Sequence, residues 1–245
     1  MIKFFRNIRH KLLSKKKFSK YLIYAIGEII LVVIGILIAL QINNWNENKK
    51  ERKIERKILI DLREEIQTNR NKITTSINRR EKLLLPVNQH LKYLSESKVS
   101  FDNFKSLHGR SFWTGTVQPS FGVINSAISS GSINFIKSDS LKYMLTDWPD
   151  EVGDFIDYEE KAYVGHRLFN DYFDDKFPKN GNKYHNYSQK ELERRYKIII
   201  KDVEYVNRLL LIDNHLNAGI QIGNELIKYL DDMTSLINHE LELMK

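Results

Sequence analysis

Residues 21–42 read YLIYAIGEIILVVIGILIALQI and contain a single charged side chain, Glu28. At ~1.5 Å rise per residue, a helix of this length extends ~33 Å, which is enough to cross the hydrocarbon core of a bilayer. No other stretch of the chain is as long and as apolar. The sequence therefore predicts one transmembrane helix over residues 21–42, preceded by residues 1–20 and followed by a domain of residues 43–245.

The two flanks of the apolar stretch differ in charge. Residues 1–20 contain eight Lys or Arg and no acid, whereas residues 43–48 contain no Lys or Arg. Because the flank richer in Lys and Arg stays in the cytoplasm, the N-terminus is predicted to be cytoplasmic and the C-terminal domain exported. Bases at residues 49–53 weaken this asymmetry without reversing it. The apolar run exceeds a signal-peptide core and lacks an Ala-x-Ala cleavage site, so we expect an uncleaved anchor.

Aromatic residues lie where the two bilayer interfaces are expected. Phe18, Tyr21 and Tyr24 stand at one end of the stretch and Trp45 at the other, as in the aromatic belts of membrane proteins. Residues 2–13 have the pattern of a short basic amphipathic helix. Such a helix lies in the headgroup region of an anionic leaflet, so the anionic inner leaflet is a predicted partner. The alternative is an unstructured tail that only sets topology.

Composition excludes several kinds of site. The chain has no cysteine, so it forms no disulfide and no Cys-based zinc site. Its formal charge of +8 would favour a nucleic-acid partner. Residues 1–20 alone carry that excess, however, and the rest of the chain is neutral overall. We therefore expect no nucleic-acid partner and, in the absence of any binding motif, no cofactor.

Residues 43–245 are expected to be all-α. Apolar residues at i, i+3 and i+4 from Leu59 to Leu94 predict a helix that continues from the apolar stretch, with a kink or break near Pro86. Further helices are expected over 118–131, 138–148 (ended by Pro149), 150–177 and from a Ser188 cap onward. Residues 178–182 are expected to form a loop, and residues 97–117 carry no assignable pattern.

The last segment shows a heptad pattern. Steps of seven from Leu209 reach Leu216, Gly223, Leu230, Ile237 and Met244, and the companion row is expected at Val206, Asp213, Ile220, Ile227, Thr234 and Leu241. This pattern predicts a ~40-residue helix with a coiled-coil-like seam. Because such a helix is unstable alone in water, it should pack antiparallel along the helix that follows the span. The expected architecture is one N-terminal transmembrane helix followed by a soluble bundle of long antiparallel helices.

Two blocks of sequence carry a family resemblance. Residues 17–47, KFSKYLIYAIGEIILVVIGILIALQINNWNE, resemble the N-terminal signature of a family of uncharacterised single-pass proteins of Gram-negative bacteria. Residues 121–136, FGVINSAISSGSINFI, are similar to an internal segment of that family. The first block is specific because a generic span requires neither its Gly-Glu pair nor its Gln-Ile-Asn-Asn-Trp-Asn run. The resemblance implies an inner-membrane anchor with a helical periplasmic domain, and it implies no catalytic residues.

Glu28 is the main candidate site residue of the span. It lies ~10 Å inside by helical rise, where ionisation is costly and polar residues tend to be functional. Small residues spaced by four, as at Gly35 and Ala39, allow two helices to approach closely. The alternatives are a carboxylate served by water and nearby lysines, and a group that transfers protons or ions. The predicted assembly face consists of Gly27, Glu28, Val32, Gly35 and Ala39.

Other candidate chemistry is weaker. Ten acidic residues lie between Asp147 and Asp175, and three of them (Asp150, Asp154 and Asp157) share a helical face that a hard cation could bridge. The alternatives are a solvated face or pairing with Arg79, Arg80 and Lys82. The six histidines after the span form no helical metal motif, and residues 129–131 lack a nucleophile elbow. Residues 219–223, Gly-x-x-x-Gly, are expected to mark close helix packing.

Two classes of function are consistent with these features. The first is a membrane-anchored interaction or scaffold protein of the cell envelope, which binds itself or another envelope protein. The second is a periplasmic sensor or ligand-binding bundle. A sensor must pass its signal inward, and only about twenty residues are expected on the cytoplasmic side, without a signalling module. The sequence therefore favours the scaffold, and since it contains no catalytic motif we do not expect an enzyme.

Overall fold

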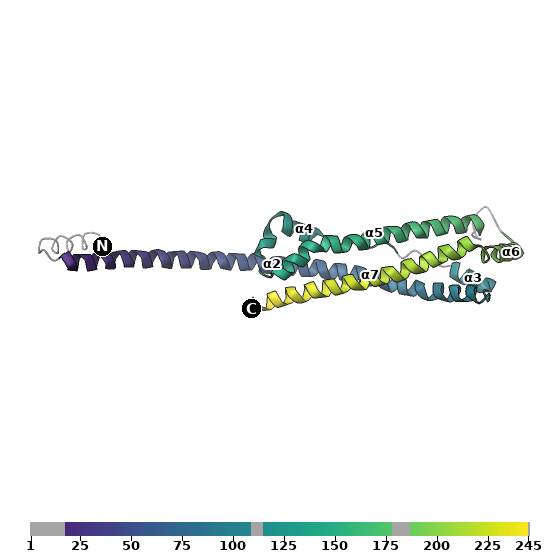
Figure 1. Ribbon diagram of the computed structural model, residues 1–245, viewed down its shortest axis with the longest axis horizontal. Helices are drawn as coiled ribbons and strands as arrows, with labels where there is room; N and C mark the ends of the chain where they lie inside the picture. Colours follow the sequence, from purple (N-terminus) through teal and green to yellow (C-terminus); the bar gives the residue numbers. More distant parts are fainter. Residues whose placement is uncertain (1–17, 109–114, 178–186, 245) are drawn as a thin grey trace. The chain divides into compact units, whose positions relative to one another are not determined.

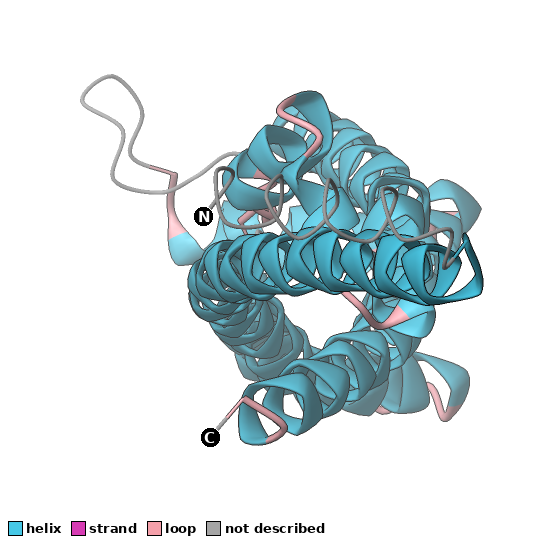
Figure 2. Cartoon of the chain, turned by 90° about the vertical axis from the view of Figure 1, so that its left-hand side faces the viewer, coloured by secondary structure: helices cyan, strands magenta, loops and turns pink. Residues whose placement is uncertain are grey.

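The computed structural model describes residues 18–108, 115–177 and 187–244. Over these ranges the chain forms six α-helices and one short 3-10 helix and contains no strand (Figure 2). The predicted all-α class is therefore confirmed. The chain divides into two compact units, Met1–Ile54 and Glu55–Lys245, here called unit 1 and unit 2. The amphipathic helix predicted for residues 2–13 and the loop predicted for residues 178–182 lie outside the described residues.

The first described helix, α2, runs from Phe18 to Ser95 and contributes to both units. The sequence predicted a kink or a break near Leu85. Pro86 lies inside this continuous helix, so a break there is wrong. Proline removes one i to i−4 hydrogen bond, whereas Val87 and His90 on the next turn are almost fully buried. Burial of that turn offsets the lost bond, and the helix continues through the proline.

The middle of unit 2 contains two α-helices and one 3-10 helix. Helix α3 spans Phe101–His108, within the segment that the sequence left unassigned. Helix α4 spans Gly122–Ser129, so the helix predicted from residue 118 begins later, and Gly131 follows it with φ +72°, as expected of a helix-ending glycine. The 3-10 helix η1 spans Ser132–Phe135.

Two long helices and one short one complete the unit. Helix α5 spans Asp139–Lys176 and contains Pro149 in its interior, so the interruption predicted at that proline is wrong. Helix α6 spans Gln189–Ile199 and helix α7 spans Val203–Glu242. The predicted caps are confirmed: Ser138 accepts a hydrogen bond from Leu141 N, and Ser188 accepts one from Glu191 N.

Contacts between side chains show how the long helices of unit 2 run. Arg70 of α2 contacts Asp231 of α7 at 2.7 Å, while His90, further along α2, contacts Tyr205 at the start of α7. The two segments are therefore antiparallel. Tyr229 of α7 donates a hydrogen bond to the carbonyl of Met144 in α5, and the two helices lie side by side in Figure 1.

The buried positions of α7 follow a strict heptad, with one correction to the expected pattern. Leu209, Leu216, Gly223, Leu230 and Ile237 are all buried, as predicted. The predicted companion row is wrong by one residue, because the buried companions are Tyr205, Ile212, Gly219, Leu226, Met233 and Glu240. The residues of the predicted row are half-buried, at the edges of the buried stripe.

The two glycines of the predicted Gly-x-x-x-Gly motif lie where α7 meets α2. A Cβ on Gly219 would lie 2.4 Å from Nε of Arg80, and one on Gly223 would lie 2.9 Å from Cγ1 of Ile77. Real Cβ atoms do not approach so closely, so a larger residue would push α7 away from α2. The predicted close packing at these glycines is confirmed.

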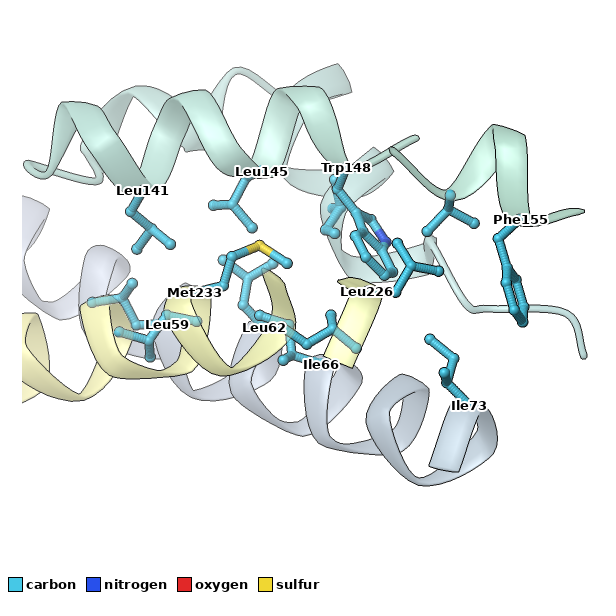
Figure 3. Close-up of a cluster of buried hydrophobic side chains, with 14 of the residues drawn as sticks. Leu59, Leu62, Ile66, Ile73, Leu141, Leu145, Trp148, Phe155, Leu226 and Met233 are labelled. Carbon is cyan, nitrogen blue, oxygen red and sulfur yellow. The ribbon is translucent and has the colours of Figure 1, made fainter. Parts of the chain in front are cut away.

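Unit 2 has two separate apolar cores. In the first core, Leu59, Leu62 and Ile66 of α2 meet Leu141, Leu145 and Trp148 of α5 and Met233 of α7 (Figure 3). The second core, towards the other end of the same helices, is formed by five helices and is rich in aromatic residues. Its buried members are Val87, Phe104, Leu107, Phe169, Tyr172, Phe173, Tyr196, Ile199, Tyr205, Leu209, Ile212 and Leu216.

Candidate functional site

The apolar stretch of α2 has its side chains exposed along the helix. Leu31 retains 71% of its accessible surface, and the most apolar 18-residue window, with mean hydropathy 2.7, has no buried residue. Within the described ranges, α2 is one helix that is long enough and apolar enough to cross a membrane. A continuous apolar surface of this size is a site for lipid or for another protein rather than for water.

The predicted assembly face lies on this exposed surface. Gly27, Glu28, Val32, Gly35 and Ala39 are all exposed. A Cβ at either glycine would meet no atom within 4 Å, so no packing within unit 1 requires a glycine there. A shallow groove of about 310 Å³ is lined by Ala25, Glu28, Ile29, Val32 and Val33. The structure therefore brings two of the five predicted residues, Glu28 and Val32, to one groove.

The aromatic residues predicted for the membrane interfaces lie at the two ends of the stretch. Tyr24 and Trp45 are exposed. They are 21 positions apart in the helix, which corresponds to about 31 Å, close to the thickness of a bilayer core. The Lys49 ammonium lies 5.2 Å from the centroid of the Trp45 ring. The side chains of Phe18 and Tyr21 lie outside the described part of the structure.

A buried ion pair joins α2 to α5 inside unit 2. Arg80 donates one hydrogen bond to the Glu159 carboxylate and another to the Ser76 hydroxyl. Arg80 retains 1% of its surface and Glu159 retains 4%. Burial raises the pKa of Glu159, and the neighbouring Arg80 and the backbone N–H of Val117 oppose that rise. The pair lies between the first and second cores, since Ile77 precedes Arg80 and Val87 follows it along α2.

This buried polar layer fixes how the helices align. A slip of α5 along α2 would separate Arg80 from Glu159 and leave two buried charges without partners, which is strongly destabilising. The close approach of Gly219 seals the layer on the α7 side. Because both charged side chains are almost fully buried, a dissolved substrate does not reach them. The arrangement is suited to structural registration of the helices.

A second buried polar group occurs within the second core. The Tyr205 hydroxyl lies 2.9 Å from Nε2 of His90 and 2.7 Å from Nε2 of His108. Tyr205 and His90 are almost fully buried. The His108 ring stacks on Phe173 with 4.1 Å between centroids. These three polar side chains, the His–Tyr–His cluster, connect α2, α3 and α7.

Acidic and amide side chains of α2 hold the segment that precedes and begins α4. The Glu65 carboxylate accepts hydrogen bonds from the Val123 and Ile124 backbone N–H groups, both at 3.1 Å. Asn69 bonds both the N–H and the carbonyl of Ser120, at 2.7 and 2.8 Å. Glu65, which belongs to α2, therefore caps the start of α4, since the N-cap residue Phe121 provides no side-chain cap.

A surface groove of about 510 Å³ runs between α2 and the segment before α4. Lys72 donates a hydrogen bond to the Gln118 carbonyl at 3.1 Å across this groove. Its walls carry two cationic groups, several hydroxyl and amide groups, and one apolar side chain. The lining residues are Thr68, Asn71, Lys72, Thr75, Arg79, Thr116, Val117 and Gln118. These residues offer positive charge and hydrogen-bonding groups to a polar or anionic group.

Comparison with protein families gives a match over most of the chain. A family described as "Family of unknown function (DUF6090)" matches residues 28–216. The chain belongs to this family. The DUF6090 match begins at Glu28 and includes the Arg80–Glu159 pair, the His–Tyr–His cluster and Glu65. No curated protein and no solved structure matches the chain.

The acidic run of this DUF6090 protein does not form a ligand set. Asp150, Asp154 and Asp157 are exposed on α5. Among the residues that the structure describes, no group of three or more His, Asp or Glu is arranged to hold a metal ion. Of the basic neighbours proposed for the run, Arg80 pairs with one of its members, Glu159.

Sequence reasoning missed the two buried polar groups of the DUF6090 chain. Arg80 and Glu159 are 79 positions apart, and His90 and Tyr205 are 115 apart. No local motif connects residues at such separations. One signal was available for the first group: the Gly-x-x-x-Gly motif of residues 219–223 predicted close helix packing where Arg80 lies against Gly219.

Proposed function

We propose that this protein is a single-pass membrane protein whose helical unit acts as an interaction or scaffold module in the cell envelope. The observation that carries the proposal is the exposed apolar surface of α2 over residues 22–42. A water-soluble helix buries an apolar stripe, whereas this one is apolar around its circumference and no residue of its most apolar window is buried. Burial in lipid accounts for that pattern.

The charge of the flanks supports a cytoplasmic N-terminus. Eight Lys or Arg lie in residues 1–20, before the apolar stretch, and such a bias orients a span with that end inside. Unit 2 would then be a periplasmic helical bundle on an inner-membrane anchor, as the resemblance to single-pass proteins of Gram-negative bacteria implies. The same bases would contact the anionic inner leaflet.

The span itself is the proposed assembly surface, for a second copy or for the span of another envelope protein. Gly35→Leu should weaken association of the isolated span in a membrane two-hybrid assay, because a larger side chain prevents close helix approach in lipid. Leu37→Phe, which adds bulk on the opposite face of the helix, is the matched control and should leave the signal unchanged.

Substitution of Glu28 separates its proposed roles. Glu28→Gln keeps the shape and the hydrogen-bonding groups, so it should preserve association if Glu28 acts as a neutral hydrogen-bonding group. Loss of association with normal insertion would instead indicate pairing with a cation or proton transfer. Equal signals from the wild type, Gly35→Leu and Glu28→Ala would make the span a plain anchor and remove the assembly proposal.

The groove beside α4 favours a second candidate function, a periplasmic sensor or ligand-binding bundle that signals through a partner. Lys72 and Arg79 offer positive charge there among hydroxyl and amide groups. Crosslinking and affinity capture of the full chain from native membranes separates the two functions. If the protein is a scaffold, the wild type and Lys72→Ala should capture the same protein partner. If it is a ligand-dependent sensor, Lys72→Ala should change the captured partners.

A further inference from the structure

The His–Tyr–His cluster holds α3 to the rest of unit 2. His108 is the last residue of α3, whereas His90 comes from α2 and Tyr205 from the first turn of α7. Apart from these polar groups, α3 buries Phe104 and Leu107. A helix of eight residues does not persist alone in water, so α3 depends on these contacts.

The hydrogen bonds of the cluster constrain which of its three side chains donates a proton and which accepts one. The Tyr205 hydroxyl has one proton to donate, and both of its partners are Nε2 atoms, at 2.9 and 2.7 Å. One imidazole must therefore accept this proton while the other donates its own N–H to the hydroxyl oxygen. The imidazole that accepts this proton is neutral in this arrangement. One further proton on the accepting Nε2 breaks the hydrogen bond from Tyr205 and places a positive charge in the second core.

The described neighbours of the cluster are mainly aromatic rings and tyrosine hydroxyls. The ring of Phe173 stacks on His108, and a ring face attracts a cation only weakly compared with the loss of water. The titratable groups that face the cluster from other helices are Tyr172 of α5 and Tyr196 of α6. The Tyr172 hydroxyl donates to Asp202 at 2.6 Å, near Glu204 and Arg208, and Tyr196 donates to the Val99 carbonyl.

We propose that the His–Tyr–His cluster is an acid-sensitive latch, which holds α3 against α2 and α7 at neutral pH and releases it when an imidazole of the cluster is protonated. Release is local, because the first core contains none of the three residues. Opening exposes the aromatic side chains of the second core that α3 covers, including the partners of Phe104. Proton uptake is thereby coupled to exposure of an apolar surface.

The direction of the pH dependence follows from where each state binds protons. Burial lowers the pKa of His90 to about 4, and burial together with the neighbouring His90 lowers that of His108 to about 3. A released imidazole has a pKa near 6.5. The open state therefore binds more protons between pH 6.5 and about 4, and the closed state loses stability as the pH falls through that window.

Hydrogen–deuterium exchange of the full chain in lipid nanodiscs tests the latch. After correction for intrinsic exchange rates, peptides from α3 should lose protection by roughly tenfold or more between pH 7 and pH 5. Peptides covering Leu59–Ile66 in the first core serve as the internal reference and should stay protected. Equal loss of protection in both regions would show general acid unfolding and would overturn the proposal.

Variants separate the cluster from other titrating groups. The double variant His90→Gln and His108→Gln keeps amide hydrogen-bonding groups near Tyr205 but removes the titration, so α3 should stay protected at pH 5. The control, His239→Gln at an exposed position of α7, should behave as the wild type. Loss of α3 protection at the same pH in the double variant would overturn the proposal.

If the double variant does not fold, imidazole NMR of the wild type decides. His90 and His108 should then titrate only together with the opening of α3. Titration of either ring near pH 6.5 with α3 still protected would overturn the proposal.

Discussion

Arg80→Met is expected to lower the free energy of unfolding of unit 2 by about 3–5 kcal/mol at pH 7, because it leaves the buried Glu159 carboxylate without its partner. Methionine fills a similar volume, so the loss reflects the unpaired charge more than a cavity. Chemical denaturation of the full chain in detergent, followed by circular dichroism, measures the change. The loss of stability caused by Arg80→Met should become smaller as the pH falls, because protonation of Glu159 removes the unpaired charge. Burial already raises the pKa of Glu159.

Two further variants isolate the ion pair. Arg79→Met removes a charge from the neighbouring exposed position and should change stability by less than about 1 kcal/mol. Arg80→Met combined with Glu159→Leu removes both buried charges and should recover most of the loss, as apolar replacements of buried ion pairs often do. A double variant that is no more stable than Arg80→Met would contradict the assigned role of the pair.

Leu230→Asp should destabilise unit 2 by about 4 kcal/mol or more, because it places an unpaired carboxylate in the first core. Leu230 has 0% exposure and packs with Leu59 and Met233 among others. Asn224→Asp introduces the same carboxylate at an exposed position of α7 and is the matched control. Thermal melting of both variants beside the wild type gives the comparison. Equal melting of Leu230→Asp and Asn224→Asp would show that the buried row of α7 is wrongly assigned.

Periodicity predicted one buried row of α7 but not its companion. The predicted companions, such as Ile220 and Ile227, are apolar residues at the edges of the buried stripe. The observed companion row contains Gly219 and Glu240, which a count of apolar residues rejects. Gly219 is buried because Arg80 occupies the space that a side chain would need. A tertiary contact therefore decides a row that local pattern assigns incorrectly.

Both errors about helix continuity have the same cause. Pro86 and Pro149 lie inside α2 and α5, where propensity alone favours a break. In α5, Trp148 and Val152 on either side of Pro149 are fully buried. Packing of the flanking turns outweighs one lost hydrogen bond, and the sequence does not state which turns are packed. The Ser138 and Ser188 caps were predictable because capping depends on residues three positions apart.

Sequence could predict only those parts of the candidate site that are formed by residues close together along the chain. The apolar stretch and its aromatic ends follow from a run of adjacent residues. The His–Tyr–His cluster does not, because it joins residues from three helices, one of them α3 in the segment without an assignable pattern. The groove beside α4 likewise depends on contacts such as Lys72 to Gln118, 46 positions apart. Such groupings require the fold to be known first.

Membrane topology tests the central claim most directly, and the chain's lack of cysteine makes the measurement simple. Single cysteines at Ser14→Cys and Asn224→Cys in the full chain can be treated with a membrane-impermeant maleimide in spheroplasts of a Gram-negative host. A single span with a cytoplasmic N-terminus predicts labelling of Asn224→Cys in intact spheroplasts and of Ser14→Cys only after lysis. Labelling of Ser14→Cys but not Asn224→Cys in intact spheroplasts, or of neither, would contradict the account.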